Sequence, residues 1–262
     1  SSLKVFEKSV ELNPENTYAK LQIAKIKFVL QQYQESIADY EQILSLNPEY
    51  LPALRGIVDS HFGRARYLND NHRTGRARDH CQMTLAFIET AIRIEPTFLC
   101  LWRLLGNVFD FIGSLPEEFN HLTVPAAIIC EENSKKLKGD ELLELASKCY
   151  SRCLKLKKEN DFVWFDLVAN YYRRSTAMKN ERKVEFLKLA YEGGKYLVKL
   201  KPSKWQNWNL LGIICAAKEI DNPALAQHCF IKAATLDKKT YTSWSNLGVF
   251  YLMHNDIKLA NK

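Results

Sequence analysis

A pattern of eight residues recurs four times in this chain of 262 residues. Each copy has a tryptophan, a leucine three residues later, then glycine or valine, and an aromatic residue or cysteine three residues further on. The copies are Trp102-x-x-Leu105-Gly106-x-x-Phe109, Trp164-x-x-Leu167-Val168-x-x-Tyr171, Trp208-x-x-Leu211-Gly212-x-x-Cys215 and Trp244-x-x-Leu247-Gly248-x-x-Tyr251. Spacings of three and four residues lie on one face of an α-helix. The recurrence therefore favours stacked helical repeats.

A second phrase marks the end of a second helix in each unit. It reads Leu12-Asn13-Pro14, Leu46-Asn47-Pro48, Ile94-Glu95-Pro96 and Leu200-Lys201-Pro202, with lysine replacing proline in Leu156-Lys157-Lys158 and Leu236-Asp237-Lys238. Proline cannot continue a helix. Pro14 and Pro48 are 34 residues apart, which is the period of the tetratricopeptide repeat. We expect an all-α tetratricopeptide-repeat α-solenoid, a right-handed superhelix of antiparallel helix pairs with insertions between or within repeats.

The two phrases together divide the chain into seven segments. We expect the closing helix of a truncated repeat at 1–14, a regular repeat at 15–48, a repeat with a basic insertion at 49–96, a repeat with a long insertion (113–139) at 97–158, repeats at 159–202 and 203–238, and a truncated repeat at 239–262. Small residues mark the sites where paired helices approach closely: Ser36, Thr84, Ala146, Ala190, Ala226 and Ala260.

The long insertion contains an apolar stretch from Leu122 to Ile129, which is too apolar for a free linker. Pro116 and Pro125 interrupt any continuous helix there. We expect this segment to dock onto the solenoid, with a partner-binding loop as the alternative.

Composition argues for a binding protein rather than an enzyme or a membrane protein. No signal peptide, apolar run of 18 residues or lipidation motif occurs, so we expect a soluble protein of the cytoplasm, with the nucleus as a second compartment. No catalytic motif occurs either, and we expect no cofactor. The seven cysteines form no C-x-x-C framework. A zinc site using Cys149 and Cys153, or the pairs His80-Cys81 and His228-Cys229, is disfavoured because zinc needs four convergent ligands.

The formal net charge of +7 raises the possibility of RNA binding. Its best support is a basic segment containing Arg64, Arg66, Tyr67, Arg73, Arg76 and Arg78, which together offer charges for phosphates and a ring for stacking on a base. Asp70 and Asp79 interrupt this segment. A solvated helix surface or a protein interface is therefore the favoured interpretation, with direct RNA contact as the alternative.

The first helices of the repeats carry a candidate concave protein-binding face. Its members are aromatic, basic or amide side chains: Arg103, Asn107, Phe162, Phe165, Tyr172, Arg173, Asn209 and Asn246, with Phe28 in an earlier repeat. Such residues anchor partner segments, although packing within the solenoid is an equal alternative. Arg103 and Asn107 also begin the pattern of a clamp for a chaperone carboxylate, but Asp166 would repel that group, so a chaperone clamp is disfavoured.

Several longer strings carry a more specific resemblance. They include residues 223–232 (Pro-Ala-Leu-Ala-Gln-His-Cys-Phe-Ile-Lys) and 244–252, supported by 100–106, 141–143, 149–156 and 166–173. In this order, and with the long insertion between them, these strings resemble the tetratricopeptide scaffold subunit of the animal superkiller (Ski) complex over most of residues 51–252.

The resemblance implies a large noncatalytic scaffold that holds a DExH-type RNA helicase and WD40 propeller subunits together. That assembly feeds RNA, including messages on stalled ribosomes, to the cytoplasmic exosome for 3′-to-5′ decay. A generic peptide-binding or co-chaperone adaptor and a solenoid that contacts RNA directly remain the alternatives. The resemblance transfers no individual contact residue.

Overall fold

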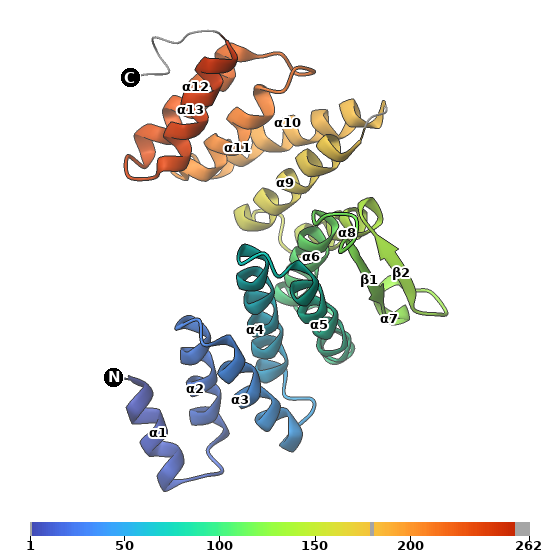
Figure 1. The fold of residues 1–262 in the computed structure, drawn as a ribbon, viewed down its shortest axis with the longest axis vertical. Coiled ribbons are helices and arrows are strands. Elements are labelled where there is room, and N and C mark those ends of the chain that lie inside the picture. The colour runs from blue at the N-terminus through green and yellow to red at the C-terminus, as the bar shows by residue number, and fades with distance from the viewer. Residues whose placement is uncertain (1, 179–180, 255–262) are drawn as a thin grey trace. The chain divides into compact units, whose positions relative to one another are not determined.

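The computed structural model describes residues 2–178 and 181–254 and consists mainly of helices that pair in chain order (Figure 1). The chain divides into two compact units, Ser1–Cys149 and Tyr150–Lys262, and each is described by itself. Short connections join the two helices of pairs such as α2 with α3 and α4 with α5, so the paired helices run in opposite directions. This is the helical repeat array expected from the sequence.

The first unit contains α1 to α7, a two-stranded sheet and the first part of α8. Its elements are α1 (Ser2–Leu12), α2 (Thr17–Val29), α3 (Tyr33–Leu46), α4 (Leu51–Asp70), α5 (Thr74–Ile94), α6 (Leu99–Gly113), β1 (His121–Val124), α7 (Ala126–Ile129), β2 (Lys135–Lys138) and α8 (Asp140–Leu156). Helix α2 packs against α3, and α4 packs against α5.

The second unit continues from the end of α8. Its helices are α9 (Asp161–Ala177), α10 (Arg182–Leu200), α11 (Trp205–Cys215), α12 (Pro223–Leu236) and α13 (Tyr241–Met253). Helix α9 packs against α10, and α11 against α12. One buried cluster includes Val168, Leu187 and Ile214, and a second includes Phe230 and Phe250.

Local sequence determines where the second helices end. Helices α1, α3, α5 and α10 end at the leucine or isoleucine of the proline phrase, and α8 and α12 end at the same point of the lysine phrase. Asparagine caps the start of two first helices, α2 and α9, where the Asn16 and Asn160 side chains accept hydrogen bonds from the backbone amides of Ala19 and Val163. Turn chemistry therefore sets the ends of the helices even where proline is absent.

The small residues expected between paired helices are buried wherever the structure describes them. Ser36, Thr84, Ala146, Ala190 and Ala226 are all completely buried, and Ala260 lies outside the described residues. The repeat glycine has the same role in Gly212, since a Cβ atom there would lie 2.8 Å from the Phe230 ring. In the copy that has Val168 instead, the partner helix provides Gly193, whose Cβ atom would lie 2.7 Å from that valine.

The basic segment is part of two long helices rather than a separate loop. Helix α4 continues to Asp70 and α5 begins at Thr74, so only residues 71–73 connect them. Gly63 lies inside α4, where a Cβ atom would meet the Tyr33 ring at 2.6 Å. Glycine here lets an aromatic side chain of the preceding helix pair approach α4 closely. The helix continues through Gly63 although glycine normally weakens a helix.

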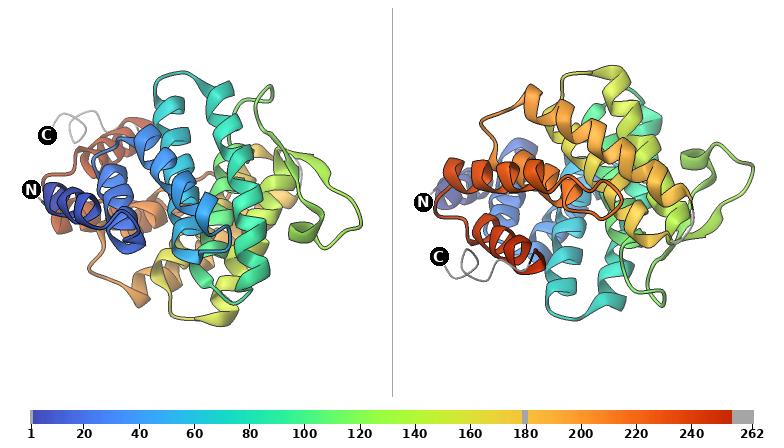
Figure 2. Two further views of the ribbon diagram at one scale, coloured as in Figure 1. Left: turned by 90° about the horizontal axis from the view of Figure 1, so that it is seen from below. Right: turned by 90° about the horizontal axis from the view of Figure 1, so that it is seen from above.

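The long insertion adds a small sheet to the helical fold. Strands β1 and β2 pair antiparallel, with His121 opposite Lys138 and Val124 opposite Lys135. Leu122, Val124 and Leu137 are buried, and β1 contacts α5 and α6. The docking expected from the apolar sequence is confirmed, whereas the two strands were not predicted. Strand β2 lies on the side of β1 away from α5 (Figures 1 and 2).

Candidate protein-binding surfaces

The first helices of the second unit line a cavity of ≈ 390 Å³. Tyr172 comes from α9, Ile213 from α11, and Asn246, Val249 and Met253 from α13. Two members of the expected concave face, Tyr172 and Asn246, are thus brought to one place among apolar side chains. Burial, followed by the negative charge of Glu219, raises the pKa of Tyr172, so its hydroxyl remains a neutral donor and acceptor.

Two asparagines of the expected face bond to each other. The Asn246 side-chain amide donates to the Asn209 carbonyl oxygen at 3.0 Å, which ties α13 to α11. Asn209 is buried, whereas Asn246 is half-buried and also lines the cavity. Asn209 is therefore a structural residue, and Asn246 is the one that a ligand in the cavity can reach.

Phe162 presents the largest aromatic surface of the expected set, with 55% of the residue exposed. The Lys204 ammonium lies 3.5 Å from the centre of its ring and 2.5 Å from the Asp161 carboxylate. These two contacts hold the start of α11 beside the start of α9. Phe162 is consequently an exposed ring whose orientation is fixed by a cation, as an anchor for a partner would require.

The remaining members of the expected face do not line this cavity. Arg103, Asn107 and Phe165 are half-buried, while Arg173 is exposed. Arg103, Asn107 and Arg173 already interact with other residues of the chain. They form part of the surface chemistry, but the cavity in the second unit is not built from them.

The first unit contains a larger cavity, of ≈ 460 Å³, between its own first helices. Phe28, which was expected on the inner face, lines it together with Val29 of α2, Arg55 and Asp59 of α4, and Phe98. Two of the lining residues are charged and lie close together, with the Arg55 guanidinium 3.7 Å from the Asp59 carboxylate. An apolar floor with charged groups at its edge suits an amphipathic protein segment.

Tyr40 and Asp59 contribute to this first cavity and were not identified in the sequence. The Tyr40 ring packs where a side chain at position 56 would otherwise lie, because a Cβ atom on Gly56 would be 2.2 Å from it. Burial, and then the nearby Asp59, raises the pKa of Tyr40 to about 12. Burial also raises the pKa of Asp59, although Arg55 opposes this. Gly56 was the only local signal, and it lies outside the repeated motif.

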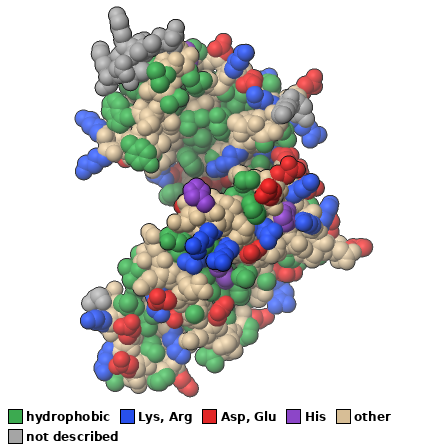
Figure 3. All heavy atoms as spheres, viewed as in Figure 1, with side chains coloured by type: hydrophobic (Ala, Val, Ile, Leu, Met, Phe, Trp, Pro, Cys, Tyr) green, Lys and Arg blue, Asp and Glu red, His purple; other side chains and the backbone are tan. Residues whose placement is uncertain are grey.

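The basic segment is not a uniform positive surface. Arg66, Arg73 and Arg76 are exposed, whereas Arg64 and Arg78 are half-buried. Arg64 lies against the ring of Tyr67, 5.7 Å from its centre. Arg78 is paired with Asp79, and the face of the molecule seen in Figure 3 carries both basic and acidic side chains. This distribution supports the interpretation as a solvated helix surface and offers three arginines for any phosphate contact.

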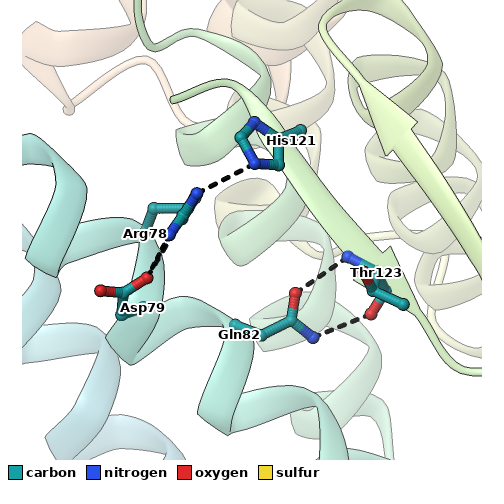
Figure 4. A network of polar contacts seen from close by, with 5 residues as sticks. All are labelled: Arg78, Asp79, Gln82, His121 and Thr123. Atoms are coloured by element: carbon teal, nitrogen blue, oxygen red, sulfur yellow. Dashed lines mark hydrogen bonds and ion pairs between the residues drawn. The ribbon is translucent and has the colours of Figure 1, made fainter. Parts of the chain in front are cut away.

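Arg78 and Gln82 hold the small sheet against α5 (Figure 4). An Arg78 guanidinium nitrogen lies 2.9 Å from Nε2 of His121, and the guanidinium also bonds to the neighbouring Asp79. The Gln82 side-chain amide donates to the Thr123 carbonyl and accepts from the Thr123 N–H, both at 2.8 Å. Arg78, which was expected to contact RNA or protein, is thus used within the fold.

The cysteines lie mainly in the core. Cys81, Cys149, Cys153, Cys215 and Cys229 are buried, and Cys130 is exposed. In the part of the chain that the structure describes, no three histidine, cysteine, aspartate or glutamate side chains are arranged to hold a metal ion. No described helix combines the length and apolar character needed to cross a membrane.

Comparison with solved structures identifies the same fold elsewhere. A tetratricopeptide repeat protein from Parabacteroides merdae superposes with a TM-score of 0.62 at 11% identity, covering 98% of this chain and 81% of that one. YrrB, a tetratricopeptide repeat protein with an unusual peptide-binding site, gives a TM-score of 0.52 at 16% identity, covering 91% of this chain and 95% of its own. At these identities the likeness shows the fold alone.

Sequence comparison gives a closer relationship. The tetratricopeptide repeat family model matches residues 18–50. Tetratricopeptide repeat protein 37 of Xenopus laevis and Superkiller complex protein 3 of Homo sapiens are each 33% identical over 269 residues, which cover 100% of this chain and 17% of each relative. Superkiller protein 3 of Schizosaccharomyces pombe is 21% identical over 240 residues, covering 82% of this chain and 17% of that protein. The chain is a tetratricopeptide-repeat protein homologous along its whole length to part of animal Superkiller complex protein 3.

Proposed function

We propose that this chain is a noncatalytic scaffold segment of a Ski-type complex in the cytoplasm. The observation that carries the proposal is the 33% identity to Superkiller complex protein 3 over the full length of the chain. The proposed partners are a DExH-type RNA helicase and WD40 propeller proteins, which the scaffold holds together for delivery of RNA to the exosome and its 3′-to-5′ decay. ATP hydrolysis would belong to the helicase.

The two cavities supply the surfaces for such a role. Each lies among first helices, and each combines apolar walls with a few polar groups: Arg55 and Asp59 in the first unit, and Tyr172 and Asn246 in the second. Protein-binding sites commonly place apolar anchors inside a polar rim. We propose that partner segments dock in these cavities and that the predicted repeats act as the modules that present them.

The test is assembly of the intact protein with the helicase and propeller subunits, comparing glutamate substitutions inside and outside the cavities. Val29 (70% exposed) and Val249 (53% exposed) line the two cavities. Leu46 (76% exposed) and Ile231 (42% exposed) line neither cavity and serve as matched controls. Because a charge in an apolar pocket must be desolvated, we expect Val29→Glu or Val249→Glu to weaken assembly about tenfold or more.

The controls Leu46→Glu and Ile231→Glu should leave assembly within about twofold, as for substitutions outside a docking pocket. Unchanged assembly in both cavity variants would remove the cavities from the proposal. Binding of short peptides or chaperones instead of the helicase and propeller proteins would favour the adaptor alternative. Binding of RNA that falls steeply with salt, and with loss of Arg66, Arg73 and Arg76, would favour the RNA alternative.

A further inference from the structure

The two edges of the small sheet differ in whether their backbone groups are hydrogen-bonded. The edge of β1 that faces α5 is closed by Gln82, whose amide bonds to both the N–H and the C=O of Thr123 at 2.8 Å (Figure 4). One side chain thus makes the pair of bonds that a neighbouring strand would make. Because both groups of Thr123 are directed to Gln82, they are directed away from β2.

This arrangement fixes which groups of β2 face outward. Bonded and non-bonded pairs alternate along an antiparallel ladder. Thr123 lies opposite Lys136 and makes no ladder bond, so Leu122 with Leu137 and Val124 with Lys135 are the bonded pairs. The N–H and C=O of Lys136 therefore point away from β1, and neither bonds to any residue that the structure describes. The next outward N–H, that of Lys138, donates to the Glu141 carboxylate at 3.1 Å.

The face of the sheet beside this open edge is basic. Lys136 and Lys138 are exposed and share the face that bears His121 and Thr123. Arg78 reaches the same face through its contact with His121. Partial desolvation, and then the positive charges of Lys136 and Arg78, lower the pKa of His121, so the ring does not add a stable cation of its own. Lys135 is on the opposite face and lies 3.9 Å from Glu131.

We propose that the outer edge of β2 is a docking strand for an extended acidic segment of a partner protein. The segment adds as a third strand, pairs its backbone with the N–H and C=O of Lys136, and places carboxylates beside Lys136 and Lys138. Lysines on a sheet edge discourage pairing with an identical edge, since like charges would meet. The same lysines favour an acidic strand, so the edge selects against a second copy of this chain. The proposal does not depend on the scaffold function.

A short synthetic peptide tests the proposal on the intact protein. The probe is a fluorescent peptide of alternating valine and glutamate with threonine at both ends, and its control carries lysine in place of glutamate. We expect the acidic peptide to bind, the lysine peptide to bind at least about tenfold more weakly, and hydrogen exchange at the Lys136 amide to slow on binding. The Leu137 amide, which already bonds to β1, should change little.

Three variants separate strand addition from simple charge attraction. Lys136→Ala removes the charge and keeps the outward N–H, whereas Lys136→Pro removes both without interrupting the ladder, as proline on an edge strand allows. The double variant Lys136→Glu with Lys138→Glu reverses the charge. We expect Lys136→Pro to bind the acidic peptide several-fold to about tenfold more weakly than Lys136→Ala, which is the loss of one backbone bond. The charge-reversed variant should prefer the lysine peptide.

Slow exchange at the Thr123 amide shows that the sheet remains docked in every variant. Equal binding by Lys136→Ala and Lys136→Pro, or unchanged exchange at Lys136, would overturn strand addition. Failure of the acidic peptide to bind would do the same. The alternative of a nucleic-acid contact is tested with a uridine 12-mer. If the protein binds this RNA but not the acidic peptide, and the lysine variants lose RNA binding, the proposal is overturned.

Discussion

At the scale of single residues, one tryptophan bond ties together the two phrases that define the repeat. In each copy the indole N–H donates to the backbone carbonyl six residues earlier. The acceptors are Pro96, Lys158, Pro202 and Lys238, and the N–O distances are 2.7, 2.8, 2.8 and 3.4 Å. The acceptor is the last residue of the phrase that ends the second helix. The backbone carbonyl of lysine can accept this bond as that of proline does, so the bond is kept where lysine replaces proline.

The bond is expected to matter most where it is short and buried. Trp102 is 6% exposed and its bond to Pro96 is 2.7 Å, whereas Trp244 is 52% exposed and its bond to Lys238 is 3.4 Å. Trp102→Phe should lower the free energy of unfolding by about 1–3 kcal/mol, from the lost bond and the smaller ring. The matched control Trp244→Phe should cost less than about 1 kcal/mol. Urea denaturation followed by circular dichroism measures both, and equal losses would argue against this role.

At the scale of elements, the long helices α4 and α5 are joined by a pair of histidines, one from each helix. Nδ1 of His61 and Nδ1 of His80 are 3.0 Å apart, and the His61 ring stacks on Phe87. At least one imidazole must be neutral to accept this bond. Burial, and then the neighbouring His80, lower the pKa of His61 to about 4. Burial, and then Arg64, also lower the pKa of His80.

This pair predicts that the first unit loses stability in acid. The unfolded chain binds a proton at each histidine near pH 6.5, but the folded chain resists protonation of His61 until about pH 4. Unfolding is therefore favoured progressively as the pH falls from 6.5 to 4, by up to about 3 kcal/mol for His61. Above pH 7 the contribution of this histidine pair to the free energy of unfolding should be constant. The double variant His61→Asn with His80→Asn should flatten the profile of unfolding free energy, and an unchanged slope would contradict it.

The docked sheet is an element whose backbone is bonded to α5 through the Gln82 side chain. Gln82→Ala removes both bonds to Thr123, leaving a backbone donor and acceptor without their partner, so we expect faster hydrogen exchange at the Thr123 amide by about tenfold or more. The Leu122 amide, which takes part in the ladder with Leu137, is the internal reference. Limited proteolysis should also become faster within residues 124–129 in the variant. Rapid cleavage there in the unchanged protein would contradict docking altogether.

The helices could be predicted from the sequence because their signals are local. The apolar phrase at Leu12 or Leu200 lies within a few residues of the helix end that it specifies. The strands could not, because each has only four residues and the docking of β1 on α5 depends on Gln82, which is 41 residues from Thr123. The same limit applies to the candidate surfaces. The Asn209–Asn246 bond joins residues 37 apart in sequence, and the position of Tyr40 in its cavity depends on Gly56 across a helix pair.

At the scale of the whole molecule, the chain consists of two compact units that each carry a cavity among first helices, and the first unit also carries a sheet with one open edge. The repeat boundaries, such as 15–48 and 203–238, remain a prediction. Residues of the expected concave face divide between these roles: Asn209 supports the fold, Asn246 and Tyr172 line a cavity, and Phe162 is held in place by a cation. A protein with several distinct surfaces is suited to hold more than one partner.

The identity of the stoichiometric partners tests this account most directly. The intact protein should be purified from cells at about 0.3 M salt, which suppresses loose phosphate-driven contacts, and its partners identified by quantitative mass spectrometry. We expect a DExH-type helicase and WD40 propeller proteins in amounts comparable to the protein itself. Recovery of chaperones in their place, or of no stoichiometric partner, would contradict the scaffold function.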